Sequence, residues 1–142
     1  MHMNFEAFVL GCGGMMPLPY RHLTSVLLRR EGELFLFDAG EATQISIRRL
    51  NLSWKKITAI FISHMHADHV TGLPGILMLN SQVDRQEPLY IFGPPRLAEF
   101  IDQTRRSLDM YINYEIIVKE FSEAATLWED PEFTIRSFGL RH

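Results

Sequence analysis

The segment Ser63–His69 constrains this chain more than any other part of its sequence. It reads Ser-His-Met-His-Ala-Asp-His and concentrates three imidazoles and a carboxylate. Neutral imidazole and carboxylate together suit zinc and neighbouring divalent metals. The nearly unbroken apolar run Ile57–Ile62 comes directly before it and predicts a strand buried inside a sheet. Potential metal ligands therefore follow the end of a buried strand.

The spacing of these side chains predicts two metal ions. Residues i and i+2 at a strand end point the same way, so His64 and His66 can bind one ion. Asp68 and His69 follow where the chain turns out of the strand, and they can face a second ion close by. This arrangement indicates a two-metal hydrolytic centre. The alternative is a polar loop that happens to be rich in histidine.

Length and composition exclude several classes of protein. A chain of 142 residues with 46% hydrophobic content fits one globular domain. The net charge of -3 gives no general basic field, so composition offers no support for a nucleic-acid partner. Cys12 is the single cysteine, which excludes an internal disulfide and fits a reducing compartment. We interpret it as a small residue beside a turn, with a catalytic thiol as the alternative.

No targeting signal is visible in the sequence. The first residues lack a basic region, and the apolar run Ala7–Leu10 is too short for a signal peptide. No stretch approaches the length of a membrane-spanning segment. We therefore expect a soluble, cytoplasmic protein with no membrane partner.

The order of the predicted elements indicates the fold class. Strands are predicted at 5–10, 23–29, 34–37, 57–62, 89–92, 115–119 and 133–136, the second and third forming a hairpin around Glu31-Gly32-Glu33. Helices are predicted at 42–50, at 73–79 and after Pro95, the last with an apolar stripe of Leu97, Phe100, Ile101 and Leu108. Hairpin-like strands followed by alternating strands and helices predict an α/β (α+β) fold with a mixed sheet covered by helices.

Asp38 stands at the end of another predicted buried strand, in Phe37-Asp38-Ala39-Gly40. A carboxylate there can accept hydrogen bonds from a neighbouring ligand loop and hold its imidazoles in one tautomer, as metal sites require. The alternative is that Asp38 only begins the turn before the next helix.

With these residues in place, the chain resembles the metallo-β-lactamase superfamily and, within it, the ribonuclease Z family, whose members mature tRNA 3′ ends. The histidine motif is typical of the whole superfamily. The stretches Gly-Glu-x-Thr-Gln and Gly-Leu-Pro-Gly narrow the resemblance to the ribonuclease Z-like branch. The matching segments are 11–14 with Pro17 and Arg21, 37–44, 60–69 and 72–75. Ala42 and Ala67 stand where that family usually has glycine. Because alanine resists positive φ, both loops are expected to sit slightly differently.

The resemblance implies a fold and a ligand set. The fold is the N-terminal half of an αββα sandwich. His64, His66 and His142 would hold one Zn²⁺ and Asp68 and His69 another, while Asp38 would support them by hydrogen bonds. Asp68 would also be the catalytic residue, because it is placed to accept the proton of the attacking water. The implied substrate is precursor tRNA.

The family also implies a second half, which would bring a bridging carboxylate and a last histidine. No Asp or Glu here has a matching context, and Asp102, Asp109, Glu129, Asp130 and Glu132 are expected to be solvated. Leu27, Phe35, Phe37, Phe61 and Ile62 are expected to leave an apolar sheet face uncovered. Residues 1–142 are thus predicted to form one domain truncated after the third metal-ligand histidine. It would need a complementing C-terminal half or a homo-oligomer, such as a homodimer, for activity.

Two other functions remain open. One is a different hydrolase on the same scaffold, such as a small-molecule phosphodiesterase, sulfatase or thioesterase. The other is an inactive metal-binding fragment. The basic side chains of Arg21, Arg29, Arg30, Arg48, Arg49, Lys55 and Lys56 could contact phosphate, although such charges more often form a solvated face. His22 and His2 are expected at the surface.

Overall fold

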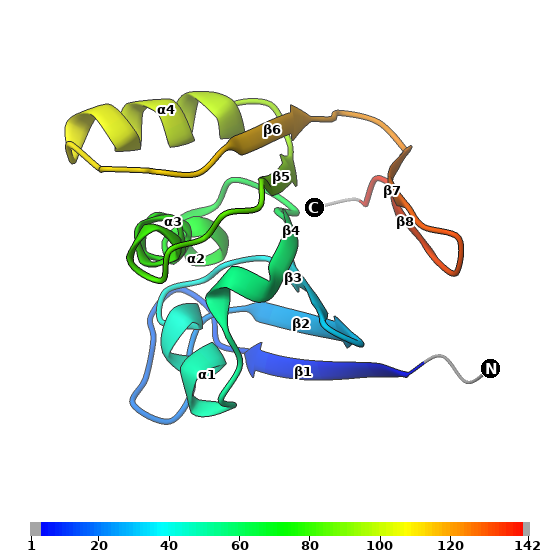
Figure 1. The fold of residues 1–142 in the computed structure, drawn as a ribbon, viewed down its shortest axis with the longest axis horizontal. Coiled ribbons are helices and arrows are strands. Elements are labelled where there is room, and N and C mark those ends of the chain that lie inside the picture. The colour runs from blue at the N-terminus through cyan, green and yellow to red at the C-terminus, as the bar shows by residue number, and fades with distance from the viewer. Residues whose placement is uncertain (1–3, 141–142) are drawn as a thin grey trace.

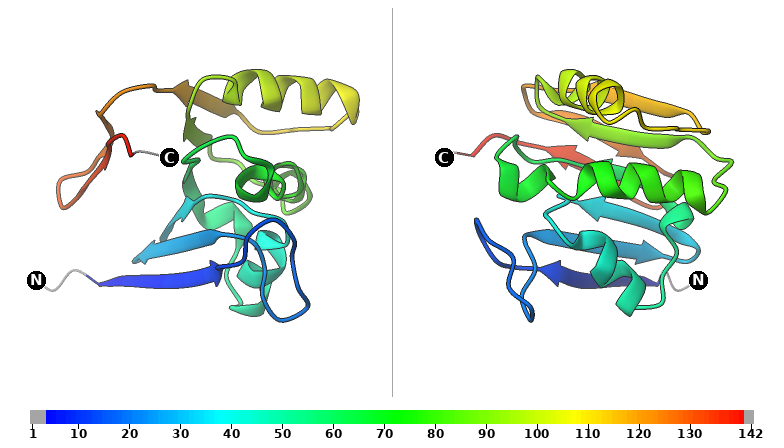
Figure 2. Two further views of the ribbon diagram at one scale, coloured as in Figure 1. Left: turned by 180° about the vertical axis from the view of Figure 1, so that it is seen from behind. Right: turned by 90° about the vertical axis from the view of Figure 1, so that its left-hand side faces the viewer.

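The computed structural model describes residues 4–140, which form three layers (Figure 1). A six-stranded sheet lies in the middle, the helices cover one face, and a two-stranded sheet packs on the other (Figures 1 and 2). The central strands are β1 (Phe5–Gly11), β2 (Ser25–Arg30), β3 (Glu33–Phe37), β4 (Ile57–Phe61), β5 (Leu89–Gly93) and β6 (Ile116–Glu120), and the outer pair is β7 (Ala125–Glu129) and β8 (Thr134–Ser137). The helices are α1 (Thr43–Arg49), α2 (Ala67–Val70), α3 (Leu73–Gln82) and α4 (Leu97–Ser107), with a 3-10 turn η1 (Trp54–Lys56).

The central sheet is mixed, as predicted. Its strands lie in sequence order, with β1, β2 and β3 antiparallel and β3 to β6 parallel. The hairpin around Glu31-Gly32-Glu33 is confirmed, since Arg30 pairs with Glu33 and Val26 with Phe37. Parallel neighbours need a crossover connection, which here carries helices. The carboxyl ends of β3, β4 and β5 therefore meet at one edge, where α/β proteins usually bind their ligands.

The main hydrophobic core lies between the central sheet and the helices. Strand β4 is buried along nearly its whole length, with Ile57, Ala59 and Ile60 at 0% exposure, as the unbroken apolar run predicted. The helices contribute buried apolar side chains to this core: Ile47, Leu73, Ile76, Leu77, Leu97 and Ile101. This core fixes β4, and with it the start of the histidine segment.

The opposite face of the sheet carries a second, aromatic core. Phe35 and Phe61 are 0% and 6% exposed, so the expectation that this face is left uncovered is wrong. The β7–β8 hairpin covers it: the Phe35 ring lies edge-on to Trp128 at 5.7 Å and to Phe133 at 5.2 Å. Strand β7 escaped prediction because its apolar pair Leu127-Trp128 is short and stands among polar and small residues.

Arg30 clasps the hairpin to the central sheet. Its guanidinium is paired with Glu132, lies 3.8 Å from Asp130, and sits 5.3 Å from the centre of the Phe133 ring. Asp130 and Glu132 are therefore not simply solvated, contrary to expectation. The hydrogen bond to Glu132 is the main cause that raises the pKa of Arg30. These contacts of Arg30 with the hairpin, called the Arg30 clasp below, join the end of β2 to the β7–β8 turn.

Helix α1 buries polar side chains beside an apolar one, and the apolar stripe predicted for α4 is only partly observed. In α1 the side chains of Thr43 and Ser46 accompany Ile47 toward the core, while Ile45 is exposed. The two hydroxyls bond to the carbonyls of Gly40 and Leu10, which gives these polar side chains partners when buried. In α4 the stripe is confirmed for Leu97 and Ile101. It is wrong for Leu108, which lies beyond the helix and is 63% exposed.

Ala42 is strained, and a glycine there should stabilise the fold. It precedes α1 with φ 74°, whereas Ala67 lies in α2 and has no positive φ. Ala42→Gly should raise the free energy of unfolding by about 0.5–1 kcal/mol, after allowing for the greater freedom of the unfolded chain. Ala67→Gly should lower it by about 0.5–1 kcal/mol, because glycine weakens a helix. Urea titration would measure both, and a destabilised Ala42→Gly variant would contradict the assignment of strain.

Candidate metal centre

Asp38 and the histidine segment come together at the carboxyl ends of two neighbouring parallel strands. Asp38 directly follows β3, and His64–His69 follow β4 and run into α2. Backbone hydrogen bonds join the two loops, from Asp38 N to Phe61 O at 2.8 Å and from Ala39 N to His69 O at 2.8 Å. The loop bearing the predicted ligands is thus held against the loop bearing Asp38.

The Asp38 carboxylate is the hub of this arrangement. It accepts hydrogen bonds from the Ser63 N–H (2.7 Å), the Ser63 hydroxyl (2.8 Å) and the His69 Nδ1–H (2.8 Å). Its backbone has φ 61°, a conformation that aspartate tolerates better than most residues. Because a carboxylate accepts, Nδ1 of His69 carries the proton and Nε2 keeps its lone pair. That tautomer is the one that leaves Nε2 free for a metal.

Ser63 passes the same constraint to His64. Its hydroxyl donates its single proton to Asp38, so the His64 Nδ1, 2.9 Å away, is the donor in the bond between them. Nε2 of His64 then also keeps its lone pair. Ser63 was not singled out from the sequence, and its only signal is its position between the strand and the first histidine.

The predicted ligands are neighbours in space. The ring centres of His64 and His66 are 4.6 Å apart, and those of His64 and His69 are 4.1 Å apart. His69 Nε2 lies 3.7 Å from Asp68 Oδ1. The side chains of His69 and Asp68 are 18% and 23% exposed, which leaves them accessible from solvent.

A second loop reaches Asp68 from the beginning of the chain. The Met15 N–H donates to Asp68 Oδ2 at 3.3 Å, and Met15 itself has φ 63°. This hydrogen bond is the largest cause that lowers the pKa of Asp68 below its ordinary value, with a further contribution from His69. The contact was not predicted, because a backbone donor 53 residues away leaves no mark in the local sequence.

The donor set fits a divalent metal ion in its chemistry. It combines the imidazole of His69, whose Nδ1–H donates to Asp38, and the neighbouring imidazoles of His64 and His66 with a carboxylate of lowered pKa. Within residues 4–140, however, no three His, Cys, Asp or Glu side chains are arranged as they stand to hold one ion. The predicted ligand His142 lies outside the described residues, as does His2. The assignment of ligands therefore stays a prediction.

Gly72 is needed for the close approach of the two loops. A Cβ at Gly72 would meet Gly40 O at 2.2 Å, and the Gly72 N–H bonds to Ala39 O. Gly72→Ala should therefore lower the free energy of unfolding by about 1–3 kcal/mol and displace the histidine loop. Gly32→Ala is the matched control, since a Cβ at Gly32 meets nothing within 4 Å. Equal urea midpoints for both variants would contradict this role.

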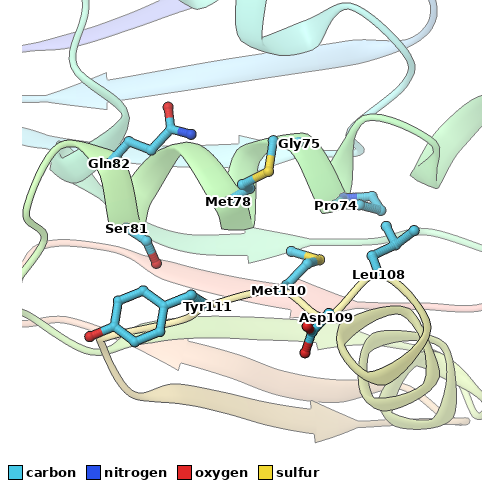
Figure 3. Close-up of a pocket in the computed structure, with 9 residues that line it drawn as sticks. All are labelled: Pro74, Gly75, Met78, Ser81, Gln82, Leu108, Asp109, Met110 and Tyr111. Atoms are coloured by element: carbon cyan, nitrogen blue, oxygen red, sulfur yellow. The ribbon is translucent and has the colours of Figure 1, made fainter.

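A groove lies elsewhere, between α3 and the segment after α4 (Figure 3). Its volume is about 470 Å³, and apolar side chains such as Met78, Leu108 and Met110 supply much of its lining. None of the predicted ligands lines it. The groove is therefore distinct from the candidate metal centre.

Comparisons with known proteins find relatives along nearly the whole chain. The family model described as "Anti-Pycsar protein Apyc1" matches residues 5–141. Ribonuclease Z of Treponema denticola is 71% identical over 140 residues, and that of Treponema pallidum is 72% identical over 142. The alignments cover 99% and 100% of this chain and 46% of each relative, so the chain spans about half the length of these curated relatives.

Solved structures show the same fold. The short form of human tRNase Z matches with a TM-score of 0.86 and 32% identity, over 93% of this chain and 57% of that one. YhfI of Bacillus subtilis, a metallo-β-lactamase fold protein, matches with a TM-score of 0.71 at 18% identity. The fold class is thus confirmed as that of roughly half a metallo-β-lactamase fold protein. Since its model covers nearly the whole chain, the chain belongs to the family described as "Anti-Pycsar protein Apyc1", and it is similar along its length to ribonucleases Z and to proteins of the metallo-β-lactamase fold.

Proposed function

We propose that this chain is the N-terminal, metal-binding part of a zinc-dependent endoribonuclease that matures tRNA 3′ ends. The observation that carries the proposal is the Asp38–His69 hydrogen bond, which leaves Nε2 available at the carboxyl end of β4. The identity of 71–72% with ribonucleases Z along the chain supports the substrate. The substrate is therefore precursor tRNA.

The roles proposed for the ligands rest on the family resemblance, and those of the supporting residues rest on their hydrogen bonds. By the resemblance, His64, His66 and His142 would hold one zinc, and Asp68 and His69 would hold the other. When bound, a two-zinc centre supplies a water of lowered pKa near neutral pH. Asp68, oriented by the Met15 N–H, accepts the proton of the attacking water. Asp38 and Ser63 keep the imidazoles of His69 and His64 in the binding tautomer.

The remaining parts of the proposal concern the whole protein. Because the curated relatives are about twice as long, residues 1–142 are proposed to act with a C-terminal half, or in a homo-oligomer such as a homodimer. In residues 4–140 no helix is long and apolar enough to cross a membrane. A cytoplasmic location stays a prediction.

The first experiment counts zinc per chain in the purified 142-residue protein by elemental mass spectrometry. Two tightly held ions would mean that a second chain completes the site. One or fewer would mean that the chain is a fragment whose activity belongs to a longer parent.

A complementation assay then tests the activity. The chain is mixed with the C-terminal segment of the Treponema denticola ribonuclease Z, and cleavage of a precursor tRNA is followed on a gel. Cleavage that needs both parts and zinc is the expected result. A mixture that hydrolyses bis(p-nitrophenyl) phosphate but leaves precursor tRNA intact would favour the alternative of a small-molecule phosphodiesterase.

A further inference from the structure

A small polar hollow lies beside α1, formed by the end of β1 and the loop that follows it. Its volume is about 200 Å³, and its lining is Val9, Leu10, Gly11, Cys12, Tyr20, Arg21, His22, Ser46 and Arg49. At about 30 Å³ per water, this is room for six or seven water molecules, enough for one sugar-phosphate unit. No predicted metal ligand lines the hollow.

The hollow is positively charged. Arg21 and Arg49 both line it, no acidic side chain does, and neither arginine forms an ion pair within the described residues. A basic residue in the last turn of α1 also complements the helix dipole. Arg48 occupies the same turn and packs over Trp54 instead, at 5.7 Å, so it offers a matched comparison. Two guanidinium groups at one hollow, both without an ion pair among residues 4–140, favour a phosphate.

His22 adds a hydrogen-bond acceptor to this charge. The Ser46 hydroxyl donates its single proton to Leu10 O at 3.0 Å. In the 2.7 Å contact between His22 and Ser46, the His22 Nδ1–H is therefore the donor and Ser46 Oγ the acceptor. Nε2 of the neutral ring then has a lone pair and no partner among the described residues. A phosphodiester bears no proton to donate at neutral pH, whereas a sugar hydroxyl does.

The loop that forms the hollow is held in place and also reaches the candidate metal centre. Gly13 N bonds to His22 O at 2.9 Å, and Leu18 N bonds to Arg21 O at 2.8 Å. Met15, on the same loop, donates to Asp68. A polymeric ligand bound at the hollow would therefore lie beside the loop that orients Asp68. Tyr20, 82% exposed, offers a ring on which a neighbouring base can stack.

We infer that this hollow is a subsite for one ribose-phosphate unit of RNA, in which Arg21 and Arg49 bind the phosphate and His22 Nε2 accepts from the 2′-hydroxyl. The inference rests on the proposed function, because it assigns this subsite to the same substrate. It assigns the recognition of RNA over DNA to His22.

Binding of short single-stranded oligonucleotides to the 142-residue chain, in the presence of a chelator, tests the inference. Fluorescence anisotropy should show RNA bound about three- to tenfold more tightly than DNA of the same sequence. Arg49→Gln should weaken RNA binding about tenfold and lower the salt slope by about 1, and Arg48→Gln should have a clearly smaller effect. Equal losses in the two arginine variants would overturn the phosphate assignment.

His22→Asn tests the acceptor separately. Asparagine keeps a side-chain N–H for Ser46 and lacks an atom at the place of Nε2, so the preference for RNA should disappear while DNA affinity stays unchanged. Equal affinity of the unaltered chain for RNA and DNA, or a preference that survives His22→Asn, would overturn the ribose assignment.

Cys12 is a native reporter, since it is exposed and lines the hollow. The RNA should slow its labelling by a maleimide, and inorganic phosphate at the same concentration should not. Equal protection by phosphate would make the hollow a general anion site and overturn the inference. The chelator makes RNA binding independent of metal. A failed binding experiment therefore leaves the zinc count and the cleavage assay valid, and a failed zinc count or cleavage assay leaves the binding result valid.

Discussion

Replacing Asp68 with alanine should lower the rate of precursor-tRNA cleavage by about 10²–10⁴-fold, the usual contribution of a positioned general base. The carboxylate is oriented by the Met15 N–H and lies 3.7 Å from His69 Nε2. Alanine preserves α2, because it is a strong helix former. The measurement is the single-turnover rate of precursor-tRNA cleavage, made with a preparation that cleaves the tRNA when Asp68 is unaltered.

Asp102→Ala is the control for this prediction. Asp102 is an exposed residue of α4 paired with Arg106, and its loss should leave the rate unchanged. Zinc content measured on the same samples separates the two roles of Asp68: loss of one zinc assigns it to metal binding, and two retained ions assign it to proton transfer. Near-normal turnover of Asp68→Ala would remove the residue from the mechanism.

The substitution Asp38→Asn should weaken zinc binding about 10–100-fold, the effect typical of groups that orient metal ligands. Asparagine is nearly isosteric with aspartate and also tolerates the backbone at φ 61°. Its amide cannot accept from all three donors that meet at Asp38. An amide N–H facing His69 Nδ1 would move the ring proton to Nε2, where it competes with the metal.

Asp84→Asn is the matched control, since Asp84 also has a positive φ, 57°, and its carboxylate accepts a hydrogen bond from the Gln86 side chain at 3.2 Å, away from the histidines. Competition with a chromogenic chelator measures the affinities, and ¹⁵N chemical shifts report the tautomer of His69. Unchanged zinc affinity in Asp38→Asn, with a shifted tautomer, would show that Asp38 does not support the metal site.

Much of the fold could be predicted from local sequence patterns. The run Ile57–Ile62 indicated β4 because a strand buried on both faces needs apolar side chains at every position. Strand β7 and the exposure of Leu108 could not be predicted in this way. Whether Trp128 packs on Phe35, or Leu108 on anything, depends on contacts between segments far apart in sequence. The aromatic core therefore became visible only in three dimensions.

The candidate site likewise contains residues that the sequence predicted and contacts that only the structure shows. His64, His66, Asp68 and His69 lie within one short segment of the chain, so their proximity follows from the sequence itself. Asp38 was singled out because it ends a neighbouring buried strand. Ser63 and the Met15 N–H went unnoticed, since a hydroxyl and a backbone donor are common everywhere and gain meaning only from the atoms they contact.

The Arg30 clasp has a thermodynamic consequence. Among residues 4–140 the two sheets share no backbone hydrogen bond, so side chains alone dock the β7–β8 hairpin. Such a unit can open at a lower free-energy cost than the central sheet, and its amides should exchange with solvent sooner. In sequence, His142 follows β8 by five residues. If His142 binds zinc as predicted, zinc binding stabilises the docked hairpin, and the docked hairpin raises the affinity for zinc by the same factor.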